Sequence, residues 1–238
     1  MGTLMNLFHL TAFSAYSFTL YQAFFNMDIP LLAHRFKKFD PGQLKYLTIW
    51  GVIAQTVFFF LCILNDLYGS NKVIPKRTPA LRRIKDYFHA AFGFPLAMFV
   101  GVVFWSLMFV DRELVLPKAL DPYFPWWLNH LMHTMVVVST VIEMLVAPRQ
   151  YPKRSYGFGG LALVMLSYLV WIHFIYYKSG IWVYPVMEVL SLPMRIVFLL
   201  ALLFFCSLLY LAGEGFDHLL WGTIKRTSSK TSKKKKTK

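Results

Sequence analysis

Two histidines and an asparagine lie close together in one apolar stretch of the chain, and a threonine lies in another. Asn129 and His133 are four residues apart and His130 and His133 are three apart, so a helix places both partners on the face that carries His133. An imidazole there can act as a general base near neutral pH. A hydroxyl such as that of Thr48 is a poor nucleophile alone and needs an adjacent base to take its proton. A Thr–His pair of this kind suits attack on an ester.

The same residues have plainer explanations. A threonine in a membrane helix most often donates to the carbonyl four residues back, which for Thr48 is that of Leu44. His130, His133 and His173 offer imidazoles that suit Zn and Fe, so a zinc or haem site is an alternative. A Gly-x-Ser-x-Gly turn does not occur in the sequence, which excludes a hydrolase of that fold. The residues alone permit a nucleophile, a metal site or a structural role.

Composition identifies the surroundings of these residues as a membrane. Of 238 residues, 57% are hydrophobic, 18% aromatic and 15% charged, and the net charge is +14. A soluble domain carries about a quarter charged residues. The charges cluster between apolar blocks and at the C-terminus, which is typical of membrane-protein loops and argues against a nucleic-acid-binding face. Cys62 and Cys206 each lie inside an apolar run, so no disulfide framework is indicated.

A membrane span needs about twenty mostly apolar residues. Six stretches qualify: 5–26, 44–64, 87–110, 126–147, 158–177 and 192–213. The first is the least hydrophobic, so a five-span version stays open. We therefore expect an all-α, polytopic transmembrane helical bundle of about six spans. It forms one domain over residues 1–226, followed by a basic cytoplasmic tail, 227–238, that we expect to be disordered.

Lys and Arg are concentrated after the second and fourth spans and in the tail, which favours both termini in the cytoplasm. In that orientation Thr48 lies near the outer start of the second span and His133 in the outer half of the fourth. His173 lies near the outer end of the fifth span, and Tyr184 and Glu188 follow in the next outer segment. The sequence therefore predicts that these polar residues converge on one leaflet.

The tail also carries a candidate address. Lys235 and Lys236 occupy positions −4 and −3 from the C-terminus and resemble the dilysine retrieval signal of endoplasmic-reticulum membrane proteins. A Lys-rich tail that contacts anionic lipid is the alternative explanation. We expect the endoplasmic reticulum, with the plasma membrane as the alternative.

Seven short segments carry a resemblance to a known family. In chain order they are Lys45-Tyr-Leu-Thr-Ile49, Gln55-Thr-Val-Phe-Phe-Phe60, Asp111-Arg-Glu-Leu114, Trp127-Leu-Asn-His-Leu-Met-His-Thr134, Gln150-Tyr-Pro-Lys-Arg-Ser155, Trp182-Val-Tyr-Pro185 and Leu209-Tyr-Leu-Ala-Gly-Glu214. Together they resemble the family of androgen-induced and androgen-dependent TFPI-regulating membrane proteins. The resemblance covers the second to sixth spans, and the first span and the tail carry little of it.

The resemblance implies an activity. Members of that family are multi-pass threonine hydrolases of fatty acid esters of hydroxy fatty acids, lipids in which one acyl chain esterifies a hydroxyl of another. Carried over by position, the nucleophile falls on Thr48 and the catalytic histidine on His133. We infer that Asn129, His130, His173, Tyr184 and Glu188 bind substrate or support the site. Such a reaction requires no metal or cofactor, and the substrate is a lipid from the bilayer.

Two other functions stay open at this stage. The bundle could bind lipid or a regulatory partner without catalysis, and it could be a histidine-ligated haem or metal redox protein. Loss of function in Thr48→Ala would argue against the first, and a colourless, metal-free protein against the second.

Overall fold

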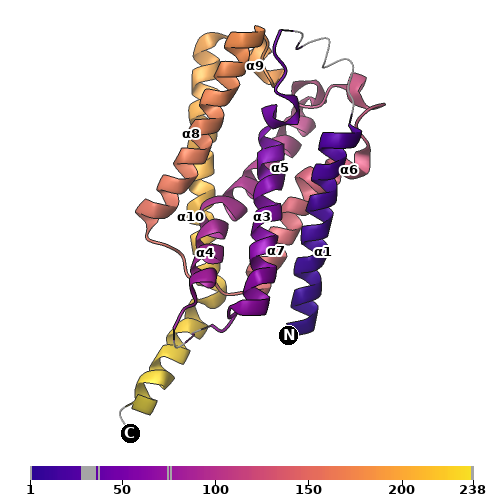
Figure 1. Ribbon diagram of the computed structural model, residues 1–238. Helices are drawn as coiled ribbons and strands as arrows, with labels where there is room; N and C mark the ends of the chain where they lie inside the picture. The colour runs from indigo at the N-terminus through magenta and orange to yellow at the C-terminus, as the bar shows by residue number, and fades with distance from the viewer. Residues whose placement is uncertain (1, 28–35, 37, 74, 76, 237–238) are drawn as a thin grey trace.

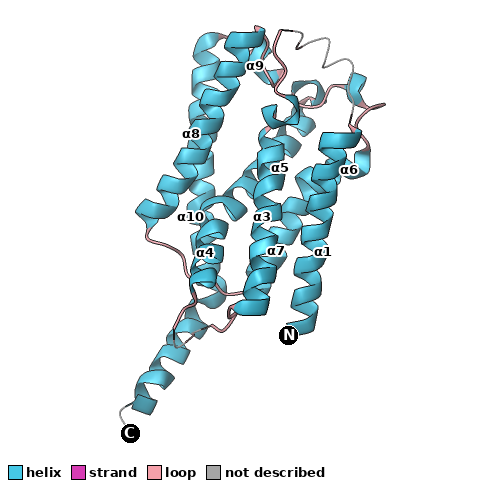
Figure 2. Cartoon of the chain, viewed as in Figure 1, coloured by secondary structure: helices cyan, strands magenta, loops and turns pink. Residues whose placement is uncertain are grey.

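The computed structural model describes residues 2–27, 36, 38–73, 75 and 77–236, and all regular structure in these residues is helical (Figures 1 and 2). Four helices are continuous: α1 (Gly2–Tyr21), α3 (Leu47–Tyr68), α8 (Arg154–Ser179) and α10 (Leu192–Lys236). Two further rods each have a π-helical turn in their middle: α4 (Ala80–Phe88), His89–Gly93 and α5 (Phe94–Val110), then α6 (Trp126–His130), Leu131–Met135 and α7 (Val136–Val146). Short α9 (Val186–Val189) precedes α10. The expected polytopic helical bundle is confirmed.

Five helical segments are long and apolar enough to cross a membrane. They are Leu47–Tyr68, Ala80–Val110, Trp126–Val146, Arg154–Ser179 and Leu192–Ile224. Helix α1 is not among them, but it runs beside α3 (Figure 1), and its buried Tyr16 stacks on Phe59 with 5.8 Å between ring centroids. Helix α1 therefore belongs to the bundle, and a sixth crossing stays a prediction.

The first turn of α1 and the last turns of α10 lie toward the same end of the bundle (Figure 1). Two chain ends on the same side of a membrane require an even number of crossings. The side of the membrane on which both ends lie stays a prediction. Helix α10 continues to Lys236 and so includes most of the basic segment 227–238. Residues 237 and 238, and the side chains from 225 onward, lie outside the described part of the chain. A separate, disordered tail stays a prediction.

Close approach of two rods at Gly101 shapes the centre of the bundle. A Cβ atom at Gly101 would lie 2.4 Å from Cγ2 of Val137 and 2.8 Å from the carbonyl oxygen of His133. Glycine therefore lets α5 pack directly on the rod that carries His133. One turn further along α5, Phe104 is brought against the imidazole of His133.

Candidate active site

The turn that carries Thr48 is held by two tyrosines from distant parts of the chain. Helix α3 begins at Leu47 rather than at residue 44, because Tyr46 is extended (φ −98°, ψ 130°). The N–H of Leu47 donates to the hydroxyls of Tyr168 (2.9 Å) and Tyr184 (3.0 Å). The first N–H groups of a helix have no partner within it, so these phenols act as a cap. Thr48 consequently lies in the first turn of α3.

The hydroxyl of Thr48 faces a histidine. Its Oγ1 lies 3.2 Å from Nε2 of His133. The carbonyl of Leu44, the plainer partner considered above, instead accepts from the indole N–H groups of Trp50 (2.9 Å) and Trp171 (3.0 Å). Three other buried or half-buried threonines do donate to the carbonyl four residues back: Thr19, Thr56 and Thr140. Thr48 differs from them in having an imidazole as its partner.

The ring of His133 is held in an orientation that suits a base. Nδ1 lies 3.0 Å from the main-chain oxygen of Asn129. A carbonyl only accepts, so Nδ1 carries the proton and the lone pair of Nε2 faces the hydroxyl of Thr48. Phe104 stacks on the imidazole at 3.6 Å between centroids and 14° between planes. The ring is 4% exposed and lies in the π-turn Leu131–Met135, a feature often found at functional sites.

The other sequence-predicted residues are placed differently. Tyr184 touches the site through the cap on Leu47, and burial raises the pKa of its phenol, which therefore stays protonated. Asn129 contributes its carbonyl, and its buried side chain lines neither cavity beside Thr48 among the described residues. The ring of His130 packs against Trp105 and Trp126, and its Nδ1 lies 3.0 Å from the hydroxyl of Thr134.

His173 and Glu188 are exposed on α8 and α9. Nδ1 of His173 donates to the carbonyl of Leu169 at 2.7 Å, and its ring packs edge-on against Trp182. In the described part of the chain, neither residue lines the cavities at Thr48. His130, His133 and His173 thus face three different surroundings, which does not suit a common metal or haem site.

Two apolar cavities meet at Thr48. The first lies between α3, α5, α8 and α10, and we call it the helix chamber; residues that line it are Thr48, Phe99, Val103, Met165, Leu169 and Leu202. The second lies under the loop that joins α5 to α6, and we call it the loop chamber; residues that line it are Thr48, Leu116, Leu120, Phe124, Met132 and His133. Apolar cavities with few polar groups are typical of ligand sites.

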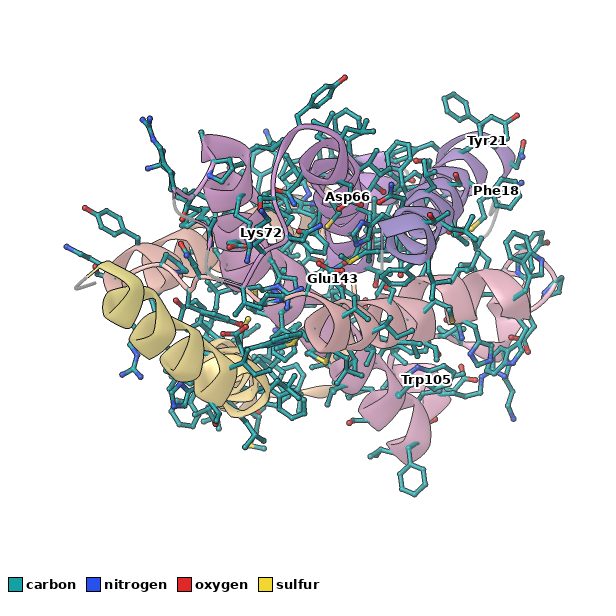
Figure 3. All side chains as sticks on the ribbon, turned by 90° about the horizontal axis from the view of Figure 1, so that it is seen from below. Phe18, Tyr21, Asp66, Lys72, Trp105 and Glu143 are labelled. Carbon is teal, nitrogen blue, oxygen red and sulfur yellow. The ribbon has the colours of Figure 1, made fainter. Side chains whose placement is uncertain are left out.

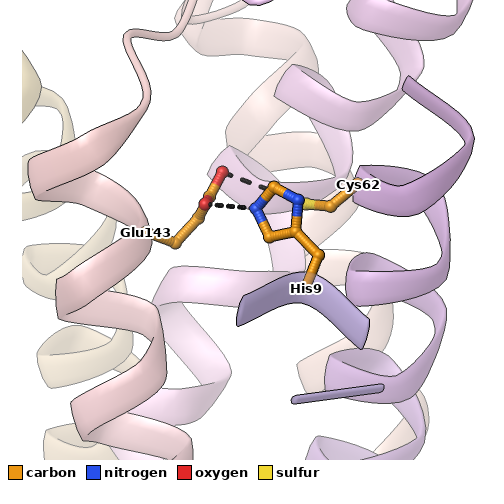
Figure 4. Close-up of side chains that lie close together, drawn as sticks. All are labelled: His9, Cys62 and Glu143. Carbon is orange, nitrogen blue, oxygen red and sulfur yellow. Dashed lines mark hydrogen bonds and ion pairs between the residues drawn. The ribbon is translucent and has the colours of Figure 1, made fainter. Parts of the chain in front are cut away.

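A second polar cluster, which the sequence did not reveal, lies nearer the chain termini. Viewed along the bundle, Asp66 and Glu143 lie among the helices, whereas Phe18 and Tyr21 lie at the edge (Figure 3). Between these carboxylates lies His9, with Nε2 2.9 Å from Glu143 and Nδ1 2.5 Å from Asp66. Figure 4 shows His9, Cys62 and Glu143 converging from three helices. A charge inside an apolar span was the one signal in the sequence.

The chemistry of this cluster is that of an ion-pair network. His9, Cys62 and Glu143 offer ligand atoms within 4.8 Å of one another, the spacing of a metal site. Both nitrogens of His9 already contact carboxylates, however, and Glu143 also faces Lys85 (3.6 Å) and Arg149 (3.2 Å). These cations disfavour a further positive charge. The network therefore joins α1 to α3, α4 and α7.

We expect Glu143→Ala to lower the free energy of unfolding by about 3–5 kcal/mol, because it leaves buried Lys85 and Arg149 without their shared carboxylate. Thermal unfolding in detergent should then occur roughly 10 °C lower. The matched control is Glu214→Ala, since Glu214 pairs with Arg154, which is 67% exposed, and should change the midpoint little. Equal midpoints for the two variants would show that the network does not stabilise the bundle.

Fold and site together define a polytopic helical membrane protein with a Thr–His pair between two apolar cavities. Comparison with known proteins shows which of them resemble this chain. The chain is 34% identical to androgen-induced gene 1 protein of Homo sapiens over 200 residues, 82% of this chain and 84% of the relative. It is 37% identical to androgen-dependent TFPI-regulating protein of Rattus norvegicus over 208 residues, 85% and 90% of the two chains.

A more distant relative, named as a membrane protein of Schizosaccharomyces pombe, is 25% identical over 161 residues, 66% of this chain and 67% of its own length. No solved structure matches the chain. Residues 4–218 match the family described as FAR-17a/AIG1-like protein, and the chain belongs to that family. The resemblance seen in the seven sequence segments is confirmed.

Proposed function

We propose that the chain is a membrane-embedded hydrolase that cleaves fatty acid esters of hydroxy fatty acids, with Thr48 as nucleophile and His133 as general base. The observation that carries the proposal is the contact between Oγ1 of Thr48 and the unprotonated Nε2 of His133, at the junction of two apolar cavities. A nucleophile within reach of an oriented base is the arrangement that acyl transfer requires. An ester between two long chains fits the two cavities.

The reaction has two steps. Nε2 of His133 takes the proton from Thr48, whose Oγ1 bonds to the ester carbonyl carbon. The tetrahedral intermediate then breaks the carbon–oxygen bond to the hydroxy fatty acid, and that oxygen takes the proton from His133. Water, deprotonated by His133, hydrolyses the acyl–Thr48 ester in the second step. The positive end of the α3 dipole, next to Thr48, favours the charge that develops on the carbonyl oxygen.

Tyr168 and Tyr184 act as positioning residues in this mechanism. The hydroxyl of Tyr168 donates to the carbonyl of Lys45 at 2.8 Å and lies 2.8 Å from that of Tyr184. Both oxygens accept from the N–H of Leu47, the residue before the nucleophile. The pair therefore fixes where α3 begins and where Thr48 points.

A covalent adduct tests the proposal directly. The purified protein in detergent is incubated with a fluorophosphonate probe, digested and mapped by mass spectrometry, while a second portion is given a branched fatty acid ester. We expect cleavage of the ester and a phosphonate on Thr48, with none on Thr56 of the same helix, which donates to its own backbone. Neither cleavage nor adduct would favour a lipid-binding scaffold. Cleavage without an adduct, abolished by a chelator, would favour metal-activated water at the histidines.

We also infer that both termini are cytoplasmic and that Lys235 and Lys236 address the protein to the endoplasmic reticulum. The site would then lie in the outer half of the membrane, where the lipid substrate is drawn from the bilayer. If a fluorescent fusion stays in the endoplasmic reticulum after both lysines are replaced by serine, the two lysines are not the retention signal.

A further inference from the structure

We propose that the helix chamber holds the acyl chain that becomes attached to Thr48 and that the loop chamber holds the hydroxy fatty acid that leaves. This inference rests on the proposed ester cleavage and assigns each half of the substrate to one cavity. Thr48, Phe104, Val115 and Tyr184 line both chambers. An ester carbonyl at Oγ1 of Thr48 therefore has one chamber on each side, and the two chains can occupy them in only two ways.

The position of His133 decides between these two ways. Among the described residues that line the chambers, His133 belongs to the loop chamber and not to the helix chamber. When the bond between the carbonyl carbon and the alcohol oxygen breaks, that oxygen takes the proton that Nε2 of His133 received from Thr48. The leaving oxygen must therefore lie on the side of His133. The acyl carbon stays bonded to Oγ1 of Thr48, and its chain extends into the helix chamber.

The polarity of the two chambers agrees with this direction. Most side chains that line the helix chamber come from the membrane-spanning helices α3, α5, α8 and α10, and Val115, Tyr184, Val186 and Met187 complete the lining. This apolar lining suits an acyl chain without a charge. The loop chamber lies under the segment between α5 and α6 and is also lined by Gln43. That segment also carries the exposed ion pair of Arg112 and Asp121, neither of which lines the chamber among the described residues. The free carboxylate of a hydroxy fatty acid can remain at this polar end.

The second step requires the same arrangement. Once the hydroxy fatty acid has left, the loop chamber is vacant beside His133, and water can reach Nε2 there. The acyl chain meanwhile stays in the helix chamber and keeps the acyl–Thr48 carbonyl in place. The carbon–oxygen bond that forms with water lies where the bond to the alcohol broke, and the proton that water loses returns to Thr48 through His133.

Two matched leucine variants test the assignment. Leu202 lines the helix chamber and Leu120 the loop chamber, so each is replaced by tryptophan in the full-length protein. kcat/KM is measured for one ester series of increasing acyl length and for a second series of increasing hydroxy acid length. Leu202→Trp should lower kcat/KM for long acyl chains by about tenfold or more, which corresponds to roughly two lost methylene contacts. The dependence of kcat/KM on hydroxy acid length in the second series should stay the same. Leu120→Trp should do the reverse.

A short ester that fills neither chamber, together with fluorophosphonate labelling, reports whether each variant retains a folded site. Where either tryptophan prevents folding, Leu202→Ala and Leu120→Ala lengthen the chambers instead, and each should favour longer chains in its own series. Effects exchanged between the two series would reverse the assignment, and equal effects on both would overturn it. Absence of cleavage by the wild-type protein would instead overturn the proposed function itself.

Discussion

The Thr48→Ala variant is expected to lose ester cleavage by roughly 10⁴-fold or more in kcat, because no other hydroxyl faces Nε2 of His133 among the described hydrogen bonds. Labelling by a fluorophosphonate should disappear with it. The loss should fall on kcat rather than on KM, since both apolar chambers remain in place to bind the chains. Initial rates over a range of ester concentrations in one detergent measure both quantities.

Two companion variants make this result specific. Thr48→Ser keeps a hydroxyl in the same turn and should retain both labelling and cleavage. Thr56→Ala removes a hydroxyl that donates to the carbonyl of Val52 at 2.9 Å, two turns along the same helix, and should change kcat little. Because Thr48 is only half-buried, its loss should leave the thermal midpoint unchanged. Cleavage that persists in Thr48→Ala would remove this residue as the nucleophile.

Hydropathy and charge were sufficient to predict the bundle, because a run of about twenty apolar residues is the length that a membrane-spanning helix needs. Five predicted spans recur in the structure, although the helix expected from residue 87 begins at Ala80 and the one expected to end at residue 213 continues to Ile224. The expected first turn of α3 was wrong for a reason that lies elsewhere in the chain. Tyr168 and Tyr184 cap Leu47 from more than a hundred residues away, and local sequence cannot report such a contact.

The two histidines of Trp126–Val146 show the same limit within one helix. Their spacing predicted that Asn129, His130 and His133 lie close together on one helix. Residue type alone could not tell which of the two histidines faces Thr48. His130 precedes the π-turn Leu131–Met135 and His133 lies within it, and in the structure His130 packs against tryptophans while His133 faces Thr48. Spacing assumed a regular α-helix, so it could not foresee that Asn129 would act through its carbonyl.

Pairing across helices was the other feature that spacing could not supply. His9 and Glu143 are separated by 134 residues, and no local pattern links them. Glu143 also pairs at 3.2 Å with Arg149, which is only six residues further along the chain. Buried charge could thus be recognised from the sequence, whereas its long-range partners required the fold.

The second large effect is expected for His133→Ala. Without the imidazole, Thr48 has no base and the leaving oxygen has no proton donor, so kcat should fall by roughly 10³-fold or more. His130→Ala should cost far less, since its ring packs against Trp105 and Trp126 rather than facing Thr48. His218→Ala, at the opposite end of the bundle, is the control for loss of a histidine. A greater loss in His130→Ala than in His133→Ala would exchange their roles.

The double variant Thr48→Ala, His133→Ala separates a catalytic pair from two independently useful residues. If hydroxyl and imidazole act as one unit, removing the second should cost almost nothing once the first is gone, so the double variant should be about as slow as the slower single variant. Independent contributions would instead multiply, and the double variant would be slower than either by the full factor of the other. Contact at 3.2 Å through an oriented Nε2 predicts the first outcome.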